Sequence, residues 1–195
     1  IVNNASTPDI YNYSYNKFSE PNDNFVISRN FHGEILSVYA DNIWDLTPYA
    51  PSLTQTYKIH FYKDLKNKKN IFELKKLFFL IMVIGSPFKS QTYSVTTLTV
   101  NYKILSHLAQ FAEYKNKTFY EILSDNKYLK EFISNYTHRK RYLGRLIPLL
   151  LFLDKMDNNL TGIHFKKDEK LLNYLKKIVY NEIKYNKQTE IIPSK

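Results

Sequence analysis

Four residues are of types that could together carry out attack on a phosphodiester. His138 and Arg141 form an H-x-x-R pattern, His164 follows Arg141 by 23 residues, and Tyr174 follows ten residues later. A tyrosine hydroxyl can attack phosphorus when nearby cations stabilise the charge that develops on the phosphate oxygens. Because the chain contains 17 tyrosines, a tyrosine close to such a pattern is expected by chance. Coincidence explains the pattern better than a catalytic role for Tyr174.

The sequence shows no residue pattern typical of other kinds of catalytic site. The chain has no cysteine, so it has no thiolate nucleophile and no thiolate metal ligand. Its four glycines form no phosphate-binding loop, and its acidic residues are scattered. No two histidines stand at a metal-ligand spacing. The histidines are His32, His60, His107, His138 and His164. The sequence therefore predicts a chain that is not an enzyme and that uses no metal or cofactor.

Positive charge is concentrated after residue 57. Residues 1–57 carry two basic and six acidic side chains, whereas residues 58–195 carry 26 basic and 12 acidic ones. Such a surface favours a polyanion as partner, because neutralised phosphates release their counterions. A solvated basic surface without a ligand is the alternative. The longest apolar run, Leu77–Gly85, has about half of the ~20 residues of a membrane span. We therefore expect no membrane, and the lack of cysteine fits a reducing cytoplasm.

The first part of the chain contains strand-like runs. Phe25–Ser28 and Glu34–Tyr39 flank a turn at residues 30–33, in which Gly33 can take a positive φ. Together they predict a hairpin. A third short strand is expected at Tyr57–Phe61, where it would complete a small sheet.

Irregular segments surround these strands. Residues 1–24 show no hydrophobic period and predict an irregular arm. Trp44–Pro51 is expected to interrupt regular structure, because its two prolines fix φ and lack an N–H. Residues 1–66 are accordingly expected to form an irregular N-terminal region with short strands.

Further along the chain the hydrophobic period becomes helical. Gly85-Ser86-Pro87 should end the first helix, Thr118–Glu121 is a capping-box pattern that should begin a short one, and Pro148 should kink another. The sequence predicts a mainly α fold, an orthogonal helical bundle behind a small β-hairpin-containing subdomain. We expect a helical domain over 67–186 and an extended linker over 187–195. The five or six expected helices cover 71–84, 94–115, 119–123, 127–136, 139–156 and 166–185.

The helix expected at 94–115 carries a family resemblance. Ser94-Val95-Thr96-Thr97-Leu98 and the residues after it resemble the S-x-x-T-L…Y…L…F helix of the SAM-like core-binding domain in tyrosine recombinases of the phage-integrase family. As in that domain, a short capped helix, a further helix and a last apolar helix over 141–153 come next. The later residues of the pattern are Tyr102, Leu105, Leu108, Phe111 and Ala112.

Both flanks extend the resemblance. Phe31-His32-Gly33 with Ser37, and Trp44-Asp45-Leu46-Thr47-Pro48-Tyr49, resemble the N-terminal region of a large bacterial integrase-like subgroup. Lys187–Pro193 is similar to the K-Q-T-x-x-I-P link that precedes the catalytic domain there. The resemblance implies that the catalytic domain is missing from this chain, so that no catalytic role carries over.

The resemblance implies a DNA-binding, non-catalytic part of a site-specific recombinase that acts in DNA integration and recombination. In that family the core-binding and catalytic domains clamp duplex DNA. The expected partners are therefore double-stranded DNA, the catalytic domain and other protomers of the same recombinase, at the bacterial nucleoid. Hydroxyls, helix-start amides and cations bind phosphates, and arginine can also bind guanine edges. The matching residues are Lys89, Ser90, Thr92, Thr96, Thr97 and Lys103 in one cluster, and Arg139, Lys140, Arg141 and Arg145 in another.

Each cluster also has an ordinary structural interpretation, and two other functions stay open. The first cluster is equally compatible with a polar loop and helix cap. The alternative for the second is a solvated helix start, but a phosphate contact is favoured there, because cations at a helix N-terminus oppose the helix dipole. A helical protein-interaction or regulatory domain with incidental charge would show no DNA affinity that survives ~0.15 M salt. An active recombinase fragment would depend on His138, Arg141 and Tyr174, and exchange of Tyr174 for phenylalanine would abolish its covalent attachment to DNA.

Overall fold

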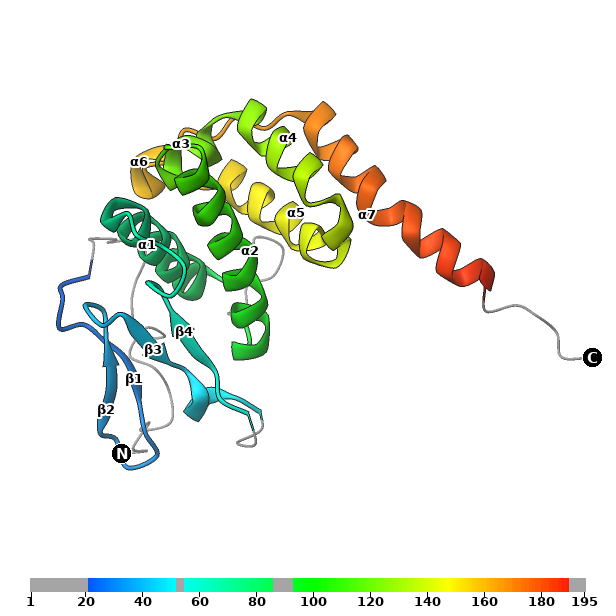
Figure 1. The fold of residues 1–195 in the computed structure, drawn as a ribbon. Coiled ribbons are helices and arrows are strands. Elements are labelled where there is room, and N and C mark those ends of the chain that lie inside the picture. Colours follow the sequence, from blue (N-terminus) through cyan, green and yellow to red (C-terminus); the bar gives the residue numbers. More distant parts are fainter. Residues whose placement is uncertain (1–20, 52–54, 86–92, 190–195) are drawn as a thin grey trace, which may run out of the picture. The chain divides into compact units, whose positions relative to one another are not determined.

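The computed structural model describes residues 21–51, 55–85 and 93–189, with 181–189 described by their backbone alone. In these ranges seven α-helices and two antiparallel hairpins are present (Figure 1). The expected mainly helical class with a hairpin-containing N-terminal part is confirmed. The chain divides into two compact units, Ile1–Tyr120 (unit 1) and Glu121–Lys195 (unit 2).

The first hairpin of unit 1 follows the sequence signal closely. Strand β1 (Val26–Arg29) pairs antiparallel with β2 (Ile35–Val38). Gly33 has a φ of 84°, and its N–H donates to the carbonyl of Asn30 at 3.0 Å, which closes the turn. The predicted hairpin and the positive φ of Gly33 are confirmed. The left-handed conformation is one that glycine adopts without a steric penalty.

The second hairpin corrects the sequence-based expectation. Strand β3 (Ile43–Asp45) pairs antiparallel with β4 (Lys58–His60), although regular structure was expected to be interrupted from Trp44 onwards. Trp44 lies opposite Ile59 and is fully buried. The first proline follows only in the 3₁₀ turn η3 (Thr47–Tyr49), so the strand ends before φ is restricted. The strand expected at residues 57–61 therefore exists, but it pairs with β3 in a hairpin separate from β1 and β2.

An aromatic cluster joins both hairpins to helix α1 (Lys68–Ile84). The ring of Trp44 lies 4.7 Å from that of Phe61 and 6.1 Å from that of Phe78, and the rings of Tyr39 and Phe79 are 5.4 Å apart. Such tilted and edge-to-face contacts add to the free energy gained by burying the rings. Because this core includes strands and helix together, the structure does not divide at residue 66 as expected. The hairpins and the first two long helices belong to one unit.

Lys75 of α1 is a buried cation inside this aromatic cluster. Its ammonium donates to the carbonyls of Ala40 at 3.1 Å and Asp41 at 2.9 Å, which ties the turn between β2 and β3 to the helix. It also lies 5.3 Å from the centre of the Phe61 ring, within range of a cation–π interaction. Burial lowers the pKa of Lys75, and the carboxylates of Asp41 and Asp23 partly offset this effect.

The second long helix of unit 1, α2 (Val95–Tyr114), begins as the sequence predicts. Ser94 is the N-cap residue, and its hydroxyl accepts the N–H of Thr97 at 3.3 Å. The short helix α3 (Phe119–Ser124) also follows the prediction. Its first N–H groups are satisfied from a distance, however, because Phe119 donates to Asn70 Oδ1 and Tyr120 donates to Glu73 Oε2, both at 2.8 Å. Two buried polar side chains of α1 thus cap α3.

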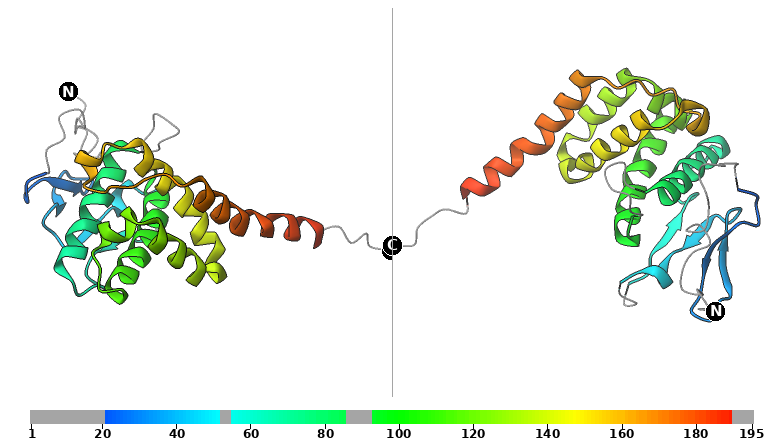
Figure 2. Two further views of the ribbon diagram at one scale, coloured as in Figure 1. Left: turned by 90° about the horizontal axis from the view of Figure 1, so that it is seen from above. Right: turned by 180° about the vertical axis from the view of Figure 1, so that it is seen from behind.

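Unit 2 consists of packed helices. Helices α4 (Asn126–Asn135), α5 (Lys140–Lys155) and the first half of α7 (Glu169–Thr189) lie side by side in both views of Figure 2, and α7 contacts both α4 and α5. A 3₁₀ turn, η4 (Thr137–Arg139), connects α4 to α5. The apolar face of α5 is fully or almost fully buried, and it comprises Leu143, Leu146, Leu149, Leu150, Phe152 and Leu153.

Two features at the end of the chain differ from the expectation. A short helix, α6 (Asn158–Thr161), was not predicted, and it is ended by Gly162 with a φ of 73°. Helix α7 continues to Thr189, so residues 187–189, expected to belong to an extended linker, are helical. None of the described helices combines the length and the apolar character that crossing a membrane requires.

Replacing Asn70 by alanine should reduce the free energy of unfolding by about 1–3 kcal/mol, because the buried N–H of Phe119 would lose its acceptor. The measurement is denaturant unfolding followed by circular dichroism. Asn173→Ala, the same exchange on the exposed face of α7, is the control and should be neutral or slightly stabilising. An Asn70→Ala variant as stable as the control would contradict the capping role.

The buried cation should make stability depend on pH in a predictable direction. Because the pKa of Lys75 is lower in the folded chain than its ordinary value of 10.5, the unfolded chain binds more protons between these two values. The wild-type protein should therefore gain stability relative to Lys75→Met as the pH is raised from neutral towards 10.5. Chemical unfolding of both proteins across this range tests the sign, and a constant difference in stability would contradict it.

Candidate nucleic-acid interface

The first predicted cluster is only partly described. Lys89, Ser90 and Thr92 lie outside the described residues. Thr96 and Lys103 are exposed on α2, seven residues apart and hence on one face of the helix. Thr97 is half-buried, and its hydroxyl lies 3.0 Å from that of Ser94. The hydroxyl of Thr97 therefore takes part in the helix cap, while Thr96 and Lys103 face solvent.

Lys103 belongs to a larger feature that the sequence did not predict. A polar stripe on α2 faces β4 and the residues just after it, and between them lies an open cavity of about 350 Å³. We call this cavity the lysine pocket. Three lysines line it, each from a different place: Lys58 from β4, Lys63 from the turn after it, and Lys103 from α2. His60, Ser106 and His107 are among the other lining residues.

Tyr102 forms part of the wall of the lysine pocket. Its ring lies 5.6 Å from Phe61 and 5.4 Å from Phe78, so the wall continues into the aromatic core. Its hydroxyl donates to the carbonyl of His60 on β4. Burial raises the pKa of Tyr102, and the nearby Asp64 carboxylate raises it further, although the hydrogen bond with Ser106 opposes this. Tyr102 is therefore uncharged at neutral pH and adds no negative charge to the pocket.

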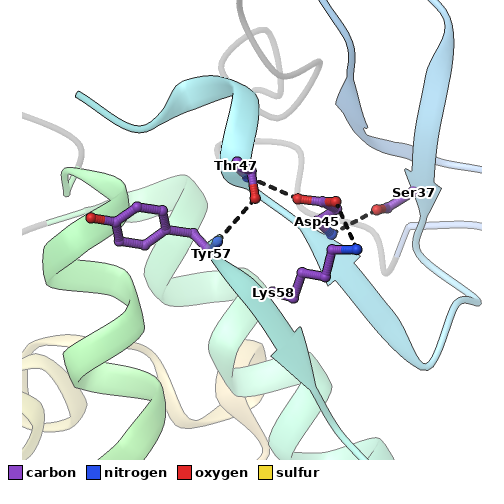
Figure 3. A network of polar contacts seen from close by, with 5 residues as sticks. All are labelled: Ser37, Asp45, Thr47, Tyr57 and Lys58. Carbon is purple, nitrogen blue, oxygen red and sulfur yellow. Dashed lines mark hydrogen bonds and ion pairs between the residues drawn. The ribbon is translucent and has the colours of Figure 1, made fainter. Parts of the chain in front are cut away.

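A network of polar contacts holds Lys58 in place (Figure 3). Asp45 lies opposite Lys58 in the β3–β4 pair, and their charged groups are 3.5 Å apart. The N–H of Asp45 donates to the hydroxyl of Ser37 at 2.8 Å, and its carboxylate accepts the N–H of Thr47 at 3.0 Å. The hydroxyl of Thr47 in turn accepts the N–H of Tyr57 at 2.9 Å. Much of the motif that resembles integrase-like proteins thus stabilises the two hairpins.

The second predicted cluster lies at the start of α5 in unit 2. Arg139 ends the 3₁₀ turn η4, and α5 begins at Lys140. Arg139, Arg141 and Arg145 are exposed, and Lys140 is half-buried. Arg141 and Arg145 are one helical turn apart and therefore lie on the same face. The structure brings the four predicted cations together at one helix end.

The N-terminus of α5 lacks the usual compensation of its dipole. The N-cap residue, Arg139, forms no side-chain hydrogen bond to the first turn, and no acidic residue lies in that turn. Cations near a helix N-terminus oppose the helix dipole by some tenths of a kcal/mol each. An anion bound there would interact favourably with both the backbone N–H groups and the arginines. A phosphate bound at this helix start would offset the unfavourable interaction between the cations and the helix dipole.

Three of the four residues considered for phosphodiester attack have separate contacts. The ring of His138 stacks on Tyr136, with ring centres 6.1 Å apart, and the backbone N–H of His164 donates to Ser124 Oγ. The hydroxyl of Tyr174 lies 3.3 Å from the hydroxyl of Ser134 on α4. Within the part of the chain that is described, no hydrogen bond, ion pair or ring contact joins Tyr174 to His138, Arg141 or His164.

No group of three or more histidine, aspartate or glutamate side chains in the described ranges could hold a metal ion. What the two surfaces offer instead is lysine and arginine charge beside hydroxyls and backbone N–H groups, the donors that bind phosphate. No family model, no curated protein and no solved structure matches this chain.

Thr47→Val should lower the free energy of unfolding by about 1–3 kcal/mol, because the N–H of Tyr57 would lose its acceptor while the side-chain shape is nearly kept. Thr96→Val makes the same exchange at an exposed position and should change stability by less than about 0.5 kcal/mol. Thermal or chemical unfolding of both variants measures the difference. Equal stability of the two variants would show that the network does not stabilise the hairpins.

Proposed function

We propose that this chain is a DNA-binding, non-catalytic segment of a site-specific tyrosine recombinase, and that its helices form a SAM-like core-binding bundle. The observation that carries the DNA-binding part is the start of α5. There three exposed arginines and a lysine surround a helix N-terminus that has neither a side-chain cap nor an acidic residue. Duplex DNA supplies closely spaced phosphates that match both the charges and the positive end of the helix dipole.

The types of side chain at this helix start favour nucleic acid over a single small anion. The planar guanidinium of arginine binds phosphate oxygens in a bidentate manner and can also bind the O6 and N7 atoms of guanine. Arg141 and Arg145 lie one turn apart on α5, so both can reach one stretch of duplex. Phosphate contacts would fix the position of the helix, and an arginine at a base edge would add sequence preference.

The recombinase part of the proposal rests on the resemblance of the sequence. Its motif residues have clear positions in the fold: Ser94 caps α2, Trp44 lies in the core of unit 1 and Thr47 belongs to the polar network. The proposal assigns no catalytic role to Tyr174, whose hydroxyl is engaged with Ser134. The chain would bind DNA, and strand cleavage would come from a separate catalytic domain.

A protein-interaction role is the second candidate, and one observation favours it. The hairpin of β1 and β2 exposes three large apolar side chains, with Phe31 57% exposed, Ile35 54% and Leu36 41%. Large apolar side chains that a folded hairpin leaves exposed can serve as contacts for a partner protein. Under this alternative the positive charge would be incidental, and DNA affinity would vanish at physiological salt.

Duplex binding across a salt series distinguishes the two candidates. Fluorescence anisotropy with a labelled duplex should show log affinity falling linearly with log salt concentration. In the variant Arg141→Ala/Arg145→Ala the slope should be shallower by about two, because two phosphate contacts are lost. Absence of binding even at low salt would exclude the proposed function for this chain and favour the protein-interaction role.

A matched control separates the helix start from overall charge. Lys127 at the start of α4 and Lys170 at the start of α7 are exposed, and the backbone of Lys166 beside them bonds to Asn126. They lie at the end of α4 that is opposite to η4 and α5. Lys127→Ala/Lys170→Ala removes the same charge, and its salt slope should stay close to that of the wild type. An equal loss in both double variants would point to net charge alone.

A further inference from the structure

We propose that the lysine pocket of unit 1 is a phosphate-binding site. The cavity of about 350 Å³ lies between β4 with the turn after it and the polar stripe of α2. It is distinct from the start of α5, which belongs to unit 2. Of its lining residues only Lys103 carried a functional expectation from the sequence.

The charges around the pocket favour an anion. Lys58 is paired with Asp45. Lys63 and Lys103 line the same cavity from opposite elements, and among the described residues neither takes part in an ion pair. Asp64 also lines the pocket, yet its carboxylate lies beyond ion-pair distance of both lysines. Two ammonium groups that face one cavity repel each other, and an anion between them would turn this repulsion into attraction.

The neutral groups of the pocket suit phosphate in particular. Ser106 contributes a hydroxyl, which accepts from the amide of Gln110 at 3.4 Å and would turn its proton from Tyr102 to donate to a phosphate oxygen. Hydroxyl and ammonium groups together are the donors that proteins use for phosphate oxygens. Tyr102 stays protonated in this wall, so it does not repel a bound anion. The side chains therefore present donors and positive charge on two sides of one open cavity.

The open shape of the pocket indicates where the phosphate comes from. A cavity that opens to solvent can receive one phosphate of a polymer without enclosing its neighbours, so we infer a nucleic-acid backbone as the source. This choice rests on the proposed DNA-binding function. The phosphate chemistry itself does not, because a free polyphosphate would bind the same lysines and hydroxyl.

The phosphate site can be tested without DNA. Inorganic tripolyphosphate, titrated into the full ¹⁵N-labelled chain, should shift the amide signals of Ser106, His107 and Gln110. Lys63→Ala/Lys103→Ala should weaken this binding by roughly tenfold, because two solvent-exposed charge contacts with the phosphate are lost. Lys69→Ala, an exposed lysine of α1 outside the pocket, should leave the titration unchanged. All the substituted lysines are exposed, and thermal unfolding checks that each variant is folded.

A second arm identifies the source of the phosphate. In the duplex salt series, Lys63→Ala/Lys103→Ala should reduce the slope by about two and Lys69→Ala should leave it near the wild-type value. If tripolyphosphate binds at the pocket but the chain binds no duplex, the phosphate site stands and the proposed DNA function fails. If the wild type binds duplex and the pocket variant keeps both its slope and its tripolyphosphate affinity, the phosphate site is overturned and the DNA function stands. Absence of any tripolyphosphate shift in the pocket also overturns the site.

Discussion

Trp44 lies fully buried where the second hairpin meets helix α1, with its ring packed against Phe61 of the hairpin and Phe78 of the helix. Removing a buried aromatic ring of this kind costs roughly 3–5 kcal/mol. The same two phenylalanines contact Tyr102 of α2, so the packing of one tryptophan fixes β4 relative to both long helices of unit 1. The lysine pocket exists because β4 and α2 are held at this distance. A substitution at Trp44 would therefore alter the geometry of the lysine pocket.

The two cationic surfaces differ in the kind of recognition that they can support. The lysine pocket offers point charges and a hydroxyl, which bind phosphate in many orientations but read no base. The start of α5 offers guanidinium groups and helix N–H groups, whose geometry is fixed and which can distinguish bases. Under the proposed function, unit 1 would contribute affinity that depends strongly on salt, and unit 2 would contribute both affinity and sequence preference.

Local signals in the sequence predicted local structure, whereas contacts between residues far apart in the chain could not be predicted from it. Gly33 marked a turn and Ser94 a helix start, because each acts within a few residues. The strand at Ile43–Asp45 was not predicted, because its partner strand lies beyond two prolines. The caps of α3 were not predicted either, because Asn70 lies 49 residues from Phe119. The cluster at the start of α5 was visible as a run of adjacent cations. The lysine pocket was not, since its three lysines meet only after β4 and α2 have packed together.

The polar network around Asp45 gives the residues of the family resemblance a structural role. Asp45 and Thr47 belong to the motif that resembles integrase-like proteins, and both bind backbone N–H groups of the hairpins. Residues with such roles are retained when a fold is retained, whatever the fold binds. A resemblance carried by them is therefore an argument for a shared N-terminal fold more than for a shared activity. DNA binding would use side chains that the fold does not need, such as the exposed arginines of α5 and the two pocket lysines, Lys63 and Lys103, that form no ion pair among the described residues.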